Sequence, residues 1–229
     1  MKSHSTGRSR SIRHEAVRAE ILGAASSAIA EHGHYGMTMR GLARSTGRAL
    51  ANFYNYFSSK EDLLFALQAK AFKAPNSSAE KALAGVYNPV ARLYVLVFNH
   101  VCYVAEHRAT IRILVHEASA LPAGRRRTVR VLKERYFQTA RGIVSSILSD
   151  ASSARNRGAP EESEVERARY SVFDMLNWSY GWYDSERHGP PHEVARTIYS
   201  VVLRGLARHC PYPKNMERHL GMDNMVLVT

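Results

Sequence analysis

Apolar residues recur at helical spacing along most of this chain, and the first of these stripes lies between residues 14 and 30. Its members share one face of a helix: Val17, Ile21, Ala24, Ala25, Ala28 and Ile29. A second helix begins after Thr38, a good N-cap residue, and carries apolar side chains on one face from Met39 to Ala43. Gly47 can take the positive φ that ends such a helix, so the pattern predicts a tight turn into a third helix near Ala49.

The third helix is short and has two different faces. Its apolar face is formed by Leu50, Phe53 and Phe57. Three polar residues point away from that face: Asn52, Asn55 and Tyr56. Ser59 then caps a further helix with an acidic first turn, and Lys60 stands where a phosphate can bind. This arrangement predicts a DNA-binding helix-turn-helix whose second helix lies in a major groove.

Apolar stripes continue through the rest of the chain. A helix is predicted over residues 59–73, and a change of composition at residues 74–78 is expected to end it. The segment from Pro89 to His107 is apolar on several faces and must be buried nearly all round. Further helices are predicted over residues 110–118, 125–148, 161–187 and 191–209. The expected fold is therefore all-α.

The expected domains follow from these helices and from two polar ends. Residues 1–13 contain hardly an apolar side chain and are expected to be a disordered basic tail. Residues 14–60 form the three-helix helix-turn-helix domain, and residues 61–209 form a larger helical domain. Residues 210–229 contain two prolines and no periodicity, so they are assigned as a C-terminal tail.

The charge of the chain indicates a polyanionic partner. Its 229 residues carry a formal net charge of +12, and the pI is about 10.0. These values favour nucleic acid or an anionic membrane surface. Charge is densest near the predicted DNA-binding domain, because residues 1–60 hold nine Lys/Arg and three Glu. The basic tail is either an arm that follows DNA phosphates or a solvated end.

Several functional classes find no support in the sequence. It contains no nucleophile elbow, Walker loop, dinucleotide-binding glycine motif or HExxH pair, so we do not expect an enzyme. No close-spaced Cys/His set suggests a metal site, and no cofactor is predicted. No stretch approaches the roughly twenty apolar residues that span a bilayer. The two cysteines fit a reduced cytoplasm, where we expect the protein to lie without membrane contact.

The helix-turn-helix stretch resembles the DNA-binding domain of the TetR family of bacterial transcriptional regulators. Residues 18–33 are similar to the family's first helix and its glycine stop. The aromatic run at residues 52–57 and the helix start at residues 59–63 stand in family order and spacing. The resemblance implies that Arg40 and the exposed positions from Ala49 to Asn55 face bases. It also implies that four residues hold phosphates: Thr38, Tyr54, Tyr56 and Lys60.

Side-chain chemistry narrows the set that reads bases. Arg40, Asn52 and Asn55 can make bidentate contacts with guanine or adenine edges, and Arg48 is a fourth candidate. Arg48, Ala49 and Leu50 depart from the family pattern, in which an aliphatic residue, a Ser or Thr cap and a basic or polar residue are usual. A non-specific architectural DNA-binding protein is therefore one alternative. A small-molecule carrier that has lost DNA readout is another.

The last two predicted helices resemble those of TetR-type regulators that control fatty-acid, steroid or aromatic acyl-CoA degradation. The resemblance rests on residues 175–183, where Trp178 and Trp182 share a helical face, and on the apolar helix that follows residue 190. In the family these helices pack against their copies, which implies a homodimer on a palindromic double-stranded operator. The residues expected at the dimer contact are Trp182, Val194, Ile198, Val201 and Val202.

The apolar excess between residues 89 and 182 predicts a cavity for a mostly apolar ligand. Its expected lining is Tyr94, Phe98, Tyr103, Tyr136, Phe137, Phe173 and Trp178. The resemblance implies an acyl-CoA effector, whose phosphates would meet Arg108, Arg112 and the cluster Arg125–Arg127. The alternative effector is an uncharged aromatic compound, as for multidrug-type regulators. The larger domain thus serves ligand binding and dimerisation, and the whole chain is expected to be a ligand-responsive repressor.

Overall fold

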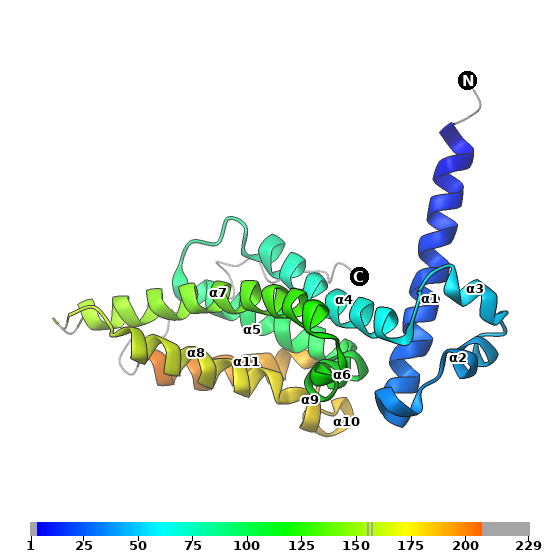
Figure 1. Cartoon of the computed structure of the whole chain (residues 1–229). Helices are drawn as coiled ribbons and strands as arrows, with labels where there is room; N and C mark the ends of the chain where they lie inside the picture. The colour runs from blue at the N-terminus through cyan, green and yellow to red at the C-terminus, as the bar shows by residue number, and fades with distance from the viewer. Residues whose placement is uncertain (1–3, 155, 157, 208–229) are drawn as a thin grey trace. The chain divides into compact units, whose positions relative to one another are not determined.

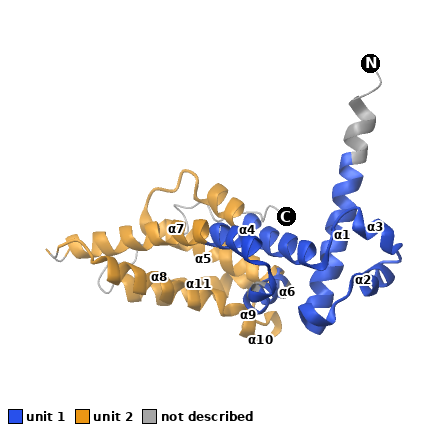
Figure 2. Cartoon of the chain, in the orientation of Figure 1, with its two compact units in different colours: residues 1–74, 107–133 blue, residues 75–106, 134–229 orange. Residues whose placement is uncertain are grey.

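The computed structural model describes residues 4–154, 156 and 158–207, and within them all regular elements are helices (Figure 1). In chain order these are α1 (His4–Gly36), α2 (Met39–Ser45), α3 (Leu50–Tyr54), α4 (Lys60–Leu83), α5 (Pro89–Glu106), α6 (Arg108–His116), the short 3-10 helix η1 (Ala118–Ala120), α7 (Ala123–Ser153), α8 (Glu162–Asn177), α9 (Ser179–Trp182), α10 (Ser185–His188) and α11 (Pro191–Ala207). The predicted all-α fold is confirmed. Two compact units share these helices (Figure 2): residues up to 74 with 107–133 form unit 1, and residues 75–106 with those from 134 form unit 2.

The core of unit 1 joins α1, α2 and α3 to α4, α6 and the start of α7. The buried residues of α1 recur at helical spacing: Ile21, Leu22, Ala25 and Ile29. Phe53 of α3 and Phe57 of the following turn enter this core beside Leu63 and Leu64 of α4. Their burial removes large apolar surfaces from water, which stabilises the packing of the short α3 on longer helices.

The end of α1 is joined to α6 and α4 through one residue, Glu117, which follows α6. Gly33 has a φ of +71°, and this positive φ interrupts α1 just before His34. The carboxylate of Glu117 accepts a hydrogen bond from the backbone N–H of His34 (2.9 Å). The backbone oxygen of Glu117 accepts another from Nε2 of the buried Gln68 (3.0 Å). Elements far apart in the sequence are therefore linked inside unit 1.

α5 is the central helix of unit 2. It packs mainly against α11 and also contacts α8 and α9, and Figure 2 shows α5, α8 and α11 side by side. Five consecutive residues, from Leu93 to Val97, are all buried. Because consecutive residues point to different sides of a helix, α5 must be covered on most of its surface. This confirms the expectation for the apolar segment between residues 89 and 107.

α1 and α4 are longer than the sequence predicted. α1 begins at His4, within the segment expected to be disordered, because extending an existing helix costs far less than nucleating one and residues 4–13 lack proline. α4 passes through the expected break at residues 74–78 and ends at Leu83. Pro75 has no N–H to donate to the preceding turn, but its side chain is buried, so packing compensates for the lost bond.

The single helix predicted over residues 161–187 is instead divided into α8, α9 and α10. At the first break the hydroxyl of Ser179 donates to the backbone oxygen of Leu176 (2.6 Å). At the second, the Asp184 carboxylate caps α10 by accepting bonds from two backbone N–H groups (2.9 and 3.2 Å). Such local bonds compete with a continuous helix.

Two further predictions concern the end of α7 and the C-terminal segment. α7 extends to Ser153, into the surface loop expected over residues 149–160. The expected tail, residues 210–229, lies outside the described residues. No helix in the described part of the chain combines the length and the apolar content needed to cross a bilayer.

Candidate nucleic-acid interface

The turn between α2 and α3 has the geometry that the sequence predicted. Thr38 caps α2, because its hydroxyl oxygen accepts a hydrogen bond from the N–H of Gly41 (3.0 Å). The Thr46 hydroxyl donates to the backbone oxygen of Leu42 (2.9 Å) at the other end of α2. Gly47 has a φ of +64°, a conformation that favours glycine. The chain then re-enters a helix at Leu50, after Ala49, which makes no side-chain cap bond.

α3 presents a polar surface on a buried apolar base. Phe53 is fully buried, Phe57 is nearly so, and Leu50 packs half-buried against the same core. Asn52 and Asn55 are exposed, although Asn55 lies just beyond the helix as its C-cap residue. The polar groups that could meet a base edge are thus held by a helix of five residues whose underside is fixed in the core.

α2 contributes two exposed arginines rather than one. Arg40, predicted to face bases, is exposed in the first turn of α2, and Arg44 is exposed one turn later. Sequence reasoning did not single out Arg44. The spacing i, i+4 from Arg40 was the available signal, because residues four apart share a helical face.

Arg48 is engaged inside the protein. Its Nη2 and Nε donate to the two carboxylate oxygens of Glu20 on α1, at 2.6 and 3.3 Å. The hydrogen bond between these groups raises the pKa of Arg48 and lowers the pKa of Glu20. A bidentate pair fixes the guanidinium plane toward α1. The Arg48 guanidinium is therefore held toward α1, and its role as a fourth base-reading residue stays a prediction.

The predicted phosphate contacts occupy different environments. Tyr54 is exposed, whereas Tyr56 is half-buried and its ring stacks on that of His14, with 4.6 Å between centroids. Lys60 begins α4, and its Nζ donates to the backbone oxygen of Tyr35 (3.2 Å). Ser59 caps this helix as predicted, accepting a bond from the N–H of Asp62 (3.1 Å). Lys60 therefore lies at the N-terminus of α4, a place that favours an anion, although its Nζ and the Asp62 N–H are bonded within the protein.

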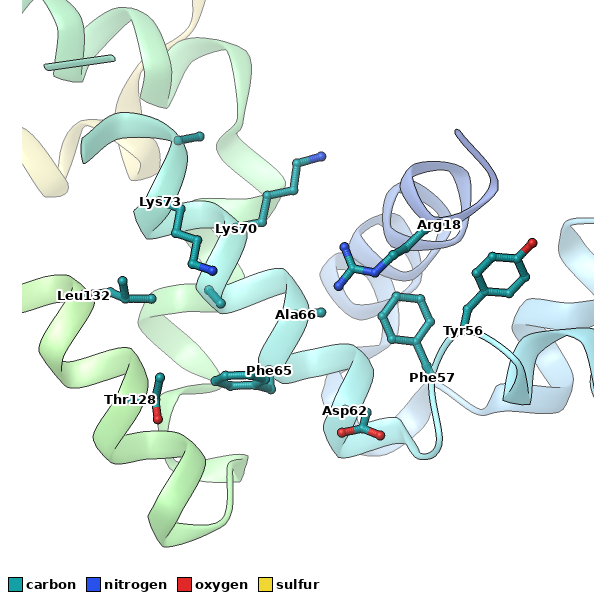
Figure 3. Close-up of a pocket in the computed structure, with 12 residues that line it drawn as sticks. Arg18, Tyr56, Phe57, Asp62, Phe65, Ala66, Lys70, Lys73, Thr128 and Leu132 are labelled. Carbon is teal, nitrogen blue, oxygen red and sulfur yellow. The ribbon is translucent and has the colours of Figure 1, made fainter. Parts of the chain in front are cut away.

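A groove of about 720 Å³ lies next to this surface, within unit 1 (Figure 3). Arg18 of α1 reaches over the ring of Phe57, 5.3 Å from its centroid, and Lys70 and Lys73 enter from α4. Its carboxylate, Asp62, is paired with Arg125 of α7. The walls of the groove are therefore basic.

The arginines expected to meet CoA phosphates all lie in unit 1. Arg125 is occupied by its ion pair with Asp62, and its guanidinium also lies over the ring of Phe65, at 5.7 Å. Four others are exposed: Arg108, Arg112, Arg126 and Arg127.

Six of the seven aromatic residues predicted to line a ligand cavity are buried or half-buried in unit 2. Tyr94 stacks with Phe98, and Phe173 contacts Phe137 and Tyr136 with ring centroids 4.2 and 5.7 Å apart. Burial raises the pKa of the half-buried Tyr103 to about 12. Trp178 is the exception, because its side chain is 63% exposed. The structure thus removes Trp178 from the buried aromatic cluster.

Some of the residues predicted to form the dimer contact are buried within one chain, and others are exposed. Val194, Ile198 and Val202 are buried in the core of unit 2, so they have little surface left for a partner. α11 is apolar on a wide stripe because it packs on α5. Trp182 and Val201 remain exposed, at 42% and 54%. Three further large apolar residues are exposed on α8 and just after it: Tyr170, Met175 and Trp178.

Comparison with known proteins places both halves of the chain in one group. A family model described as bacterial regulatory proteins, tetR family, matches residues 21–67. A second model, described as the tetracyclin repressor-like C-terminal domain, matches residues 87–206. Together these matches include the helix-turn-helix and most of unit 2.

Individual relatives agree with the family models. The HTH-type transcriptional regulator HbdR of Aromatoleum sp. (strain CIB) is 27% identical over 165 residues, which cover 72% of this chain and 68% of HbdR. The crystal structure of the TetR family regulator PfmR from Thermus thermophilus is 26% identical, with a TM-score of 0.69, and the match covers 80% of this chain and 97% of PfmR. The structure of AibR in complex with isovaleryl coenzyme A and operator DNA is 20% identical, with a TM-score of 0.68 and coverage of 80% and 96%.

Proposed function

This chain belongs to the TetR family of DNA-binding transcriptional regulators, and from that premise we propose that it represses transcription as a homodimer and leaves its operator when an acyl-CoA binds. The operator part of the proposal rests on the exposed polar surface of α2 and α3 above a buried aromatic base. Each further part, the base readout, the dimer and the effector, has its own support.

Base reading is assigned to Arg40, Asn52 and Asn55, because all three are exposed and can make bidentate contacts with base edges. Ala49 and Leu50 supply apolar contacts beside them. Thr38, Tyr54, Tyr56 and Lys60 position the phosphates, with Lys60 at the N-terminus of α4. Arg44 is added to the DNA-contacting residues because it lies one turn from Arg40 on the exposed side of α2.

The dimer is supported by the exposed apolar side chains of α8, α9 and α11. Tyr170, Met175, Trp178, Trp182 and Val201 all belong to unit 2 and all remain well exposed in one chain. α8 contacts both α9 and α11, and exposed apolar side chains on neighbouring elements mark an interaction surface. Covering it with the same elements of a second copy would give a closed dimer, which presents two recognition helices to a palindrome with half-sites about one helical turn apart.

The effector assignment is supported by the aromatic cluster of unit 2, which includes Tyr136, Phe137 and Phe173 and would favour an acyl chain. It is further supported by the sequence resemblance of the last helices to acyl-CoA-responsive regulators and by the fold shared with AibR, which was solved with isovaleryl coenzyme A. The effector would release DNA by binding more tightly to the arrangement that cannot hold the operator. A typical coupling of about 1–3 kcal/mol loosens an operator roughly 5- to 150-fold.

One experiment tests the operator and the effector in sequence. Duplexes selected from a random pool define the operator, and fluorescence anisotropy at one salt concentration measures binding to it and to random DNA. Saturated acyl-CoAs of several lengths, free fatty acids and uncharged aromatic drugs are then titrated into the operator complex. Release by acyl-CoAs supports the proposal, whereas release by drugs or free acids alone assigns the alternative, multidrug-type effector.

The same measurement tests the base-reading residues. Arg40→Ala should cost about 1–3 kcal/mol of binding free energy on the operator and little on random DNA. Lys60→Ala should weaken binding to both DNAs and reduce the slope of log K against log salt by about one unit. Wild-type protein that binds operator and random DNA equally would instead support the non-specific architectural alternative.

A further inference from the structure

His100 is a buried histidine in the middle of α5, with a side chain that makes one hydrogen bond. The residue is 8% exposed, and its ring lies against Tyr136 and Phe173, with centroids 5.8 and 6.3 Å away. Its Nδ1 lies 3.2 Å from the hydroxyl oxygen of Tyr136. Its Nε2 is buried and has no hydrogen-bond partner among the described residues. One polar edge of this ring therefore faces the interior unpaired.

Asn99, the preceding residue of α5, presents a second unpaired group in the same region. Its Oδ1 accepts a hydrogen bond from the hydroxyl of Ser78 on α4. Burial raises the pKa of Tyr136, and a hydrogen-bonding interaction with the Asn99 side chain lowers it in part, so Asn99 lies beside the Tyr136 hydroxyl although the two groups are poorly aligned. The Asn99 Nδ2 is buried and does not meet hydrogen-bond geometry with the residues described in the structure.

A buried donor without a hydrogen-bond partner lowers the stability of the folded protein. Leaving one donor unsatisfied costs on the order of tenfold in an equilibrium constant, and native proteins retain few such groups without a reason. Here two of them occur on consecutive residues, with His100 packed against the aromatic rings and Asn99 beside the Tyr136 hydroxyl. A molecule that brings an acceptor to this place gains the two hydrogen bonds that the protein lacks.

The charge state of His100 decides whether a charged or an uncharged ligand group can accept its hydrogen bond. Burial lowers its pKa to about 4, so the imidazole is neutral at physiological pH. A neutral imidazole and a neutral amide would hold a phosphate or a carboxylate poorly in an apolar interior, because neither supplies a compensating charge. They suit an uncharged acceptor, such as a carbonyl oxygen with an apolar chain attached.

We propose that His100 Nε2 and Asn99 Nδ2 donate hydrogen bonds to the thioester carbonyl oxygen of the acyl-CoA effector, while Tyr136 and Phe173 contact the adjoining acyl chain. The proposal requires that the Tyr136 hydroxyl, 3.2 Å from Nδ1 of His100, donates to that nitrogen, which keeps the imidazole proton on Nε2. This inference rests on the acyl-CoA effector of the proposed function. It names the two protein atoms, His100 Nε2 and Asn99 Nδ2, that would recognise a thioester. A hydrocarbon chain alone leaves both of these donors unpaired.

The test compares two ligands that differ at the carbonyl. Calorimetry measures the affinity of the full-length protein for the acyl-CoA that binds most tightly and for its S-alkyl thioether of equal chain length. Wild-type protein should prefer the thioester by about a hundredfold, because each of its two otherwise unpaired buried donors is worth about tenfold. His100→Phe, which keeps an aromatic ring, should lose about tenfold for the thioester and nothing for the thioether. His192→Phe, the same change at an exposed position of α11, should behave as wild type.

Asn99→Leu should lower the same preference, because it removes the second donor while keeping a similar volume. An unchanged preference in this variant would overturn the role of Asn99. Equal affinities of wild-type protein for the two ligands, or equal losses for both in His100→Phe, would overturn the subsite while leaving the acyl-CoA effector intact. If neither ligand binds wild-type protein, the effector assignment fails and the subsite fails with it, although operator binding is unaffected.

A second readout does not depend on affinity. The ¹⁵N chemical shifts of the His100 ring should report a neutral imidazole protonated at Nε2 in the free protein, and the Nε2 signal should move when the thioester binds but not when the thioether binds. A proton on Nδ1 in both states would overturn the proposal, because Nε2 would then be unable to donate.

Discussion

At the scale of single residues, the Arg48–Glu20 ion pair withdraws one cation from the surface assigned to DNA. Glu20→Gln should release Arg48 toward the phosphates, so the slope of log K against log salt should steepen by about one unit. Salt titration of binding to random DNA measures this slope. Glu15→Gln makes the same charge change five residues earlier on α1 and serves as the control. An equal steepening in both variants would show a general charge effect rather than a released arginine.

His100 should make the stability of the protein depend on pH. Its pKa is about 4 in the folded chain and near 6.5 when exposed, so the unfolded chain binds more protons in this range. Stability is then complete above about pH 6.5 and is lost as the pH falls toward 4. Between pH 7 and pH 5 the loss should be about 2 kcal/mol of the free energy of unfolding.

Denaturant titrations at the two pH values measure this loss in wild-type protein and in His100→Phe. Other histidines titrate in both proteins, so the difference isolates the contribution of His100. The variant should be less sensitive to acid, and an identical loss in both proteins would mean that His100 is hydrated in the folded state.

At the scale of elements, two glycines of unit 1 should respond oppositely to the same substitution. Gly23 lies within α1, and a Cβ added there would meet no other atom within 4 Å. Gly23→Ala should stabilise by about 0.5–1 kcal/mol, because alanine loses less conformational freedom in a helix. Gly47 also has open space, but its positive φ disfavours a side chain. Gly47→Ala should destabilise by about 1 kcal/mol.

Thermal unfolding of the two glycine variants checks both signs. Gly47→Ala should also weaken operator binding, since the turn at Gly47 sets the direction in which α3 leaves α2. Stabilisation by both substitutions would show that the turn accepts an ordinary residue, and with it a different path into α3.

Local signals explain which elements were predictable. Thr38, Gly47 and Ser59 act on the backbone within a few residues, so the starts and ends that they mark were found from the sequence. The continuation of α4 through Pro75 was not, because it depends on burial by distant residues. The breaks at Ser179 and Asp184 were missed, since the aromatic stretch around them has strong helical periodicity.

The candidate site divides in the same way. Exposure of Asn52 and Asn55 followed from the period of α3, which is a local property. The engagement of Arg48 joins residues 28 positions apart and becomes visible only when α1 packs beside the turn. Likewise, the apolar stripe of α11 predicted a buried face, but only the packing on α5 identifies what buries it.

At the scale of the whole molecule, the exposed apolar residues of unit 2 should hold two chains together. Val201→Glu places a charge at an exposed apolar position of α11 and should convert the dimer to a monomer at micromolar concentration, as measured by light scattering. Val131→Glu makes the same change at an exposed valine of unit 1 and should leave the dimer intact. A wild-type monomer would contradict the dimer itself. A dimer that survives in Val201→Glu would place the contact elsewhere.

Pro75 makes α4 flexible near the middle of the helix. Both α4 and α7 continue from one compact unit into the other, α4 at residues 74–75 and α7 at residues 133–134. α7 contains no proline near residues 133–134, whereas α4 lacks the bond that the N–H of residue 75 would make. α4 is therefore easier to bend near residue 75 than a helix with an unbroken series of backbone hydrogen bonds. Pro75→Ala should restore the missing backbone hydrogen bond and make α4 more rigid there. Slower amide hydrogen exchange in the α4 residues around position 75 would measure the change.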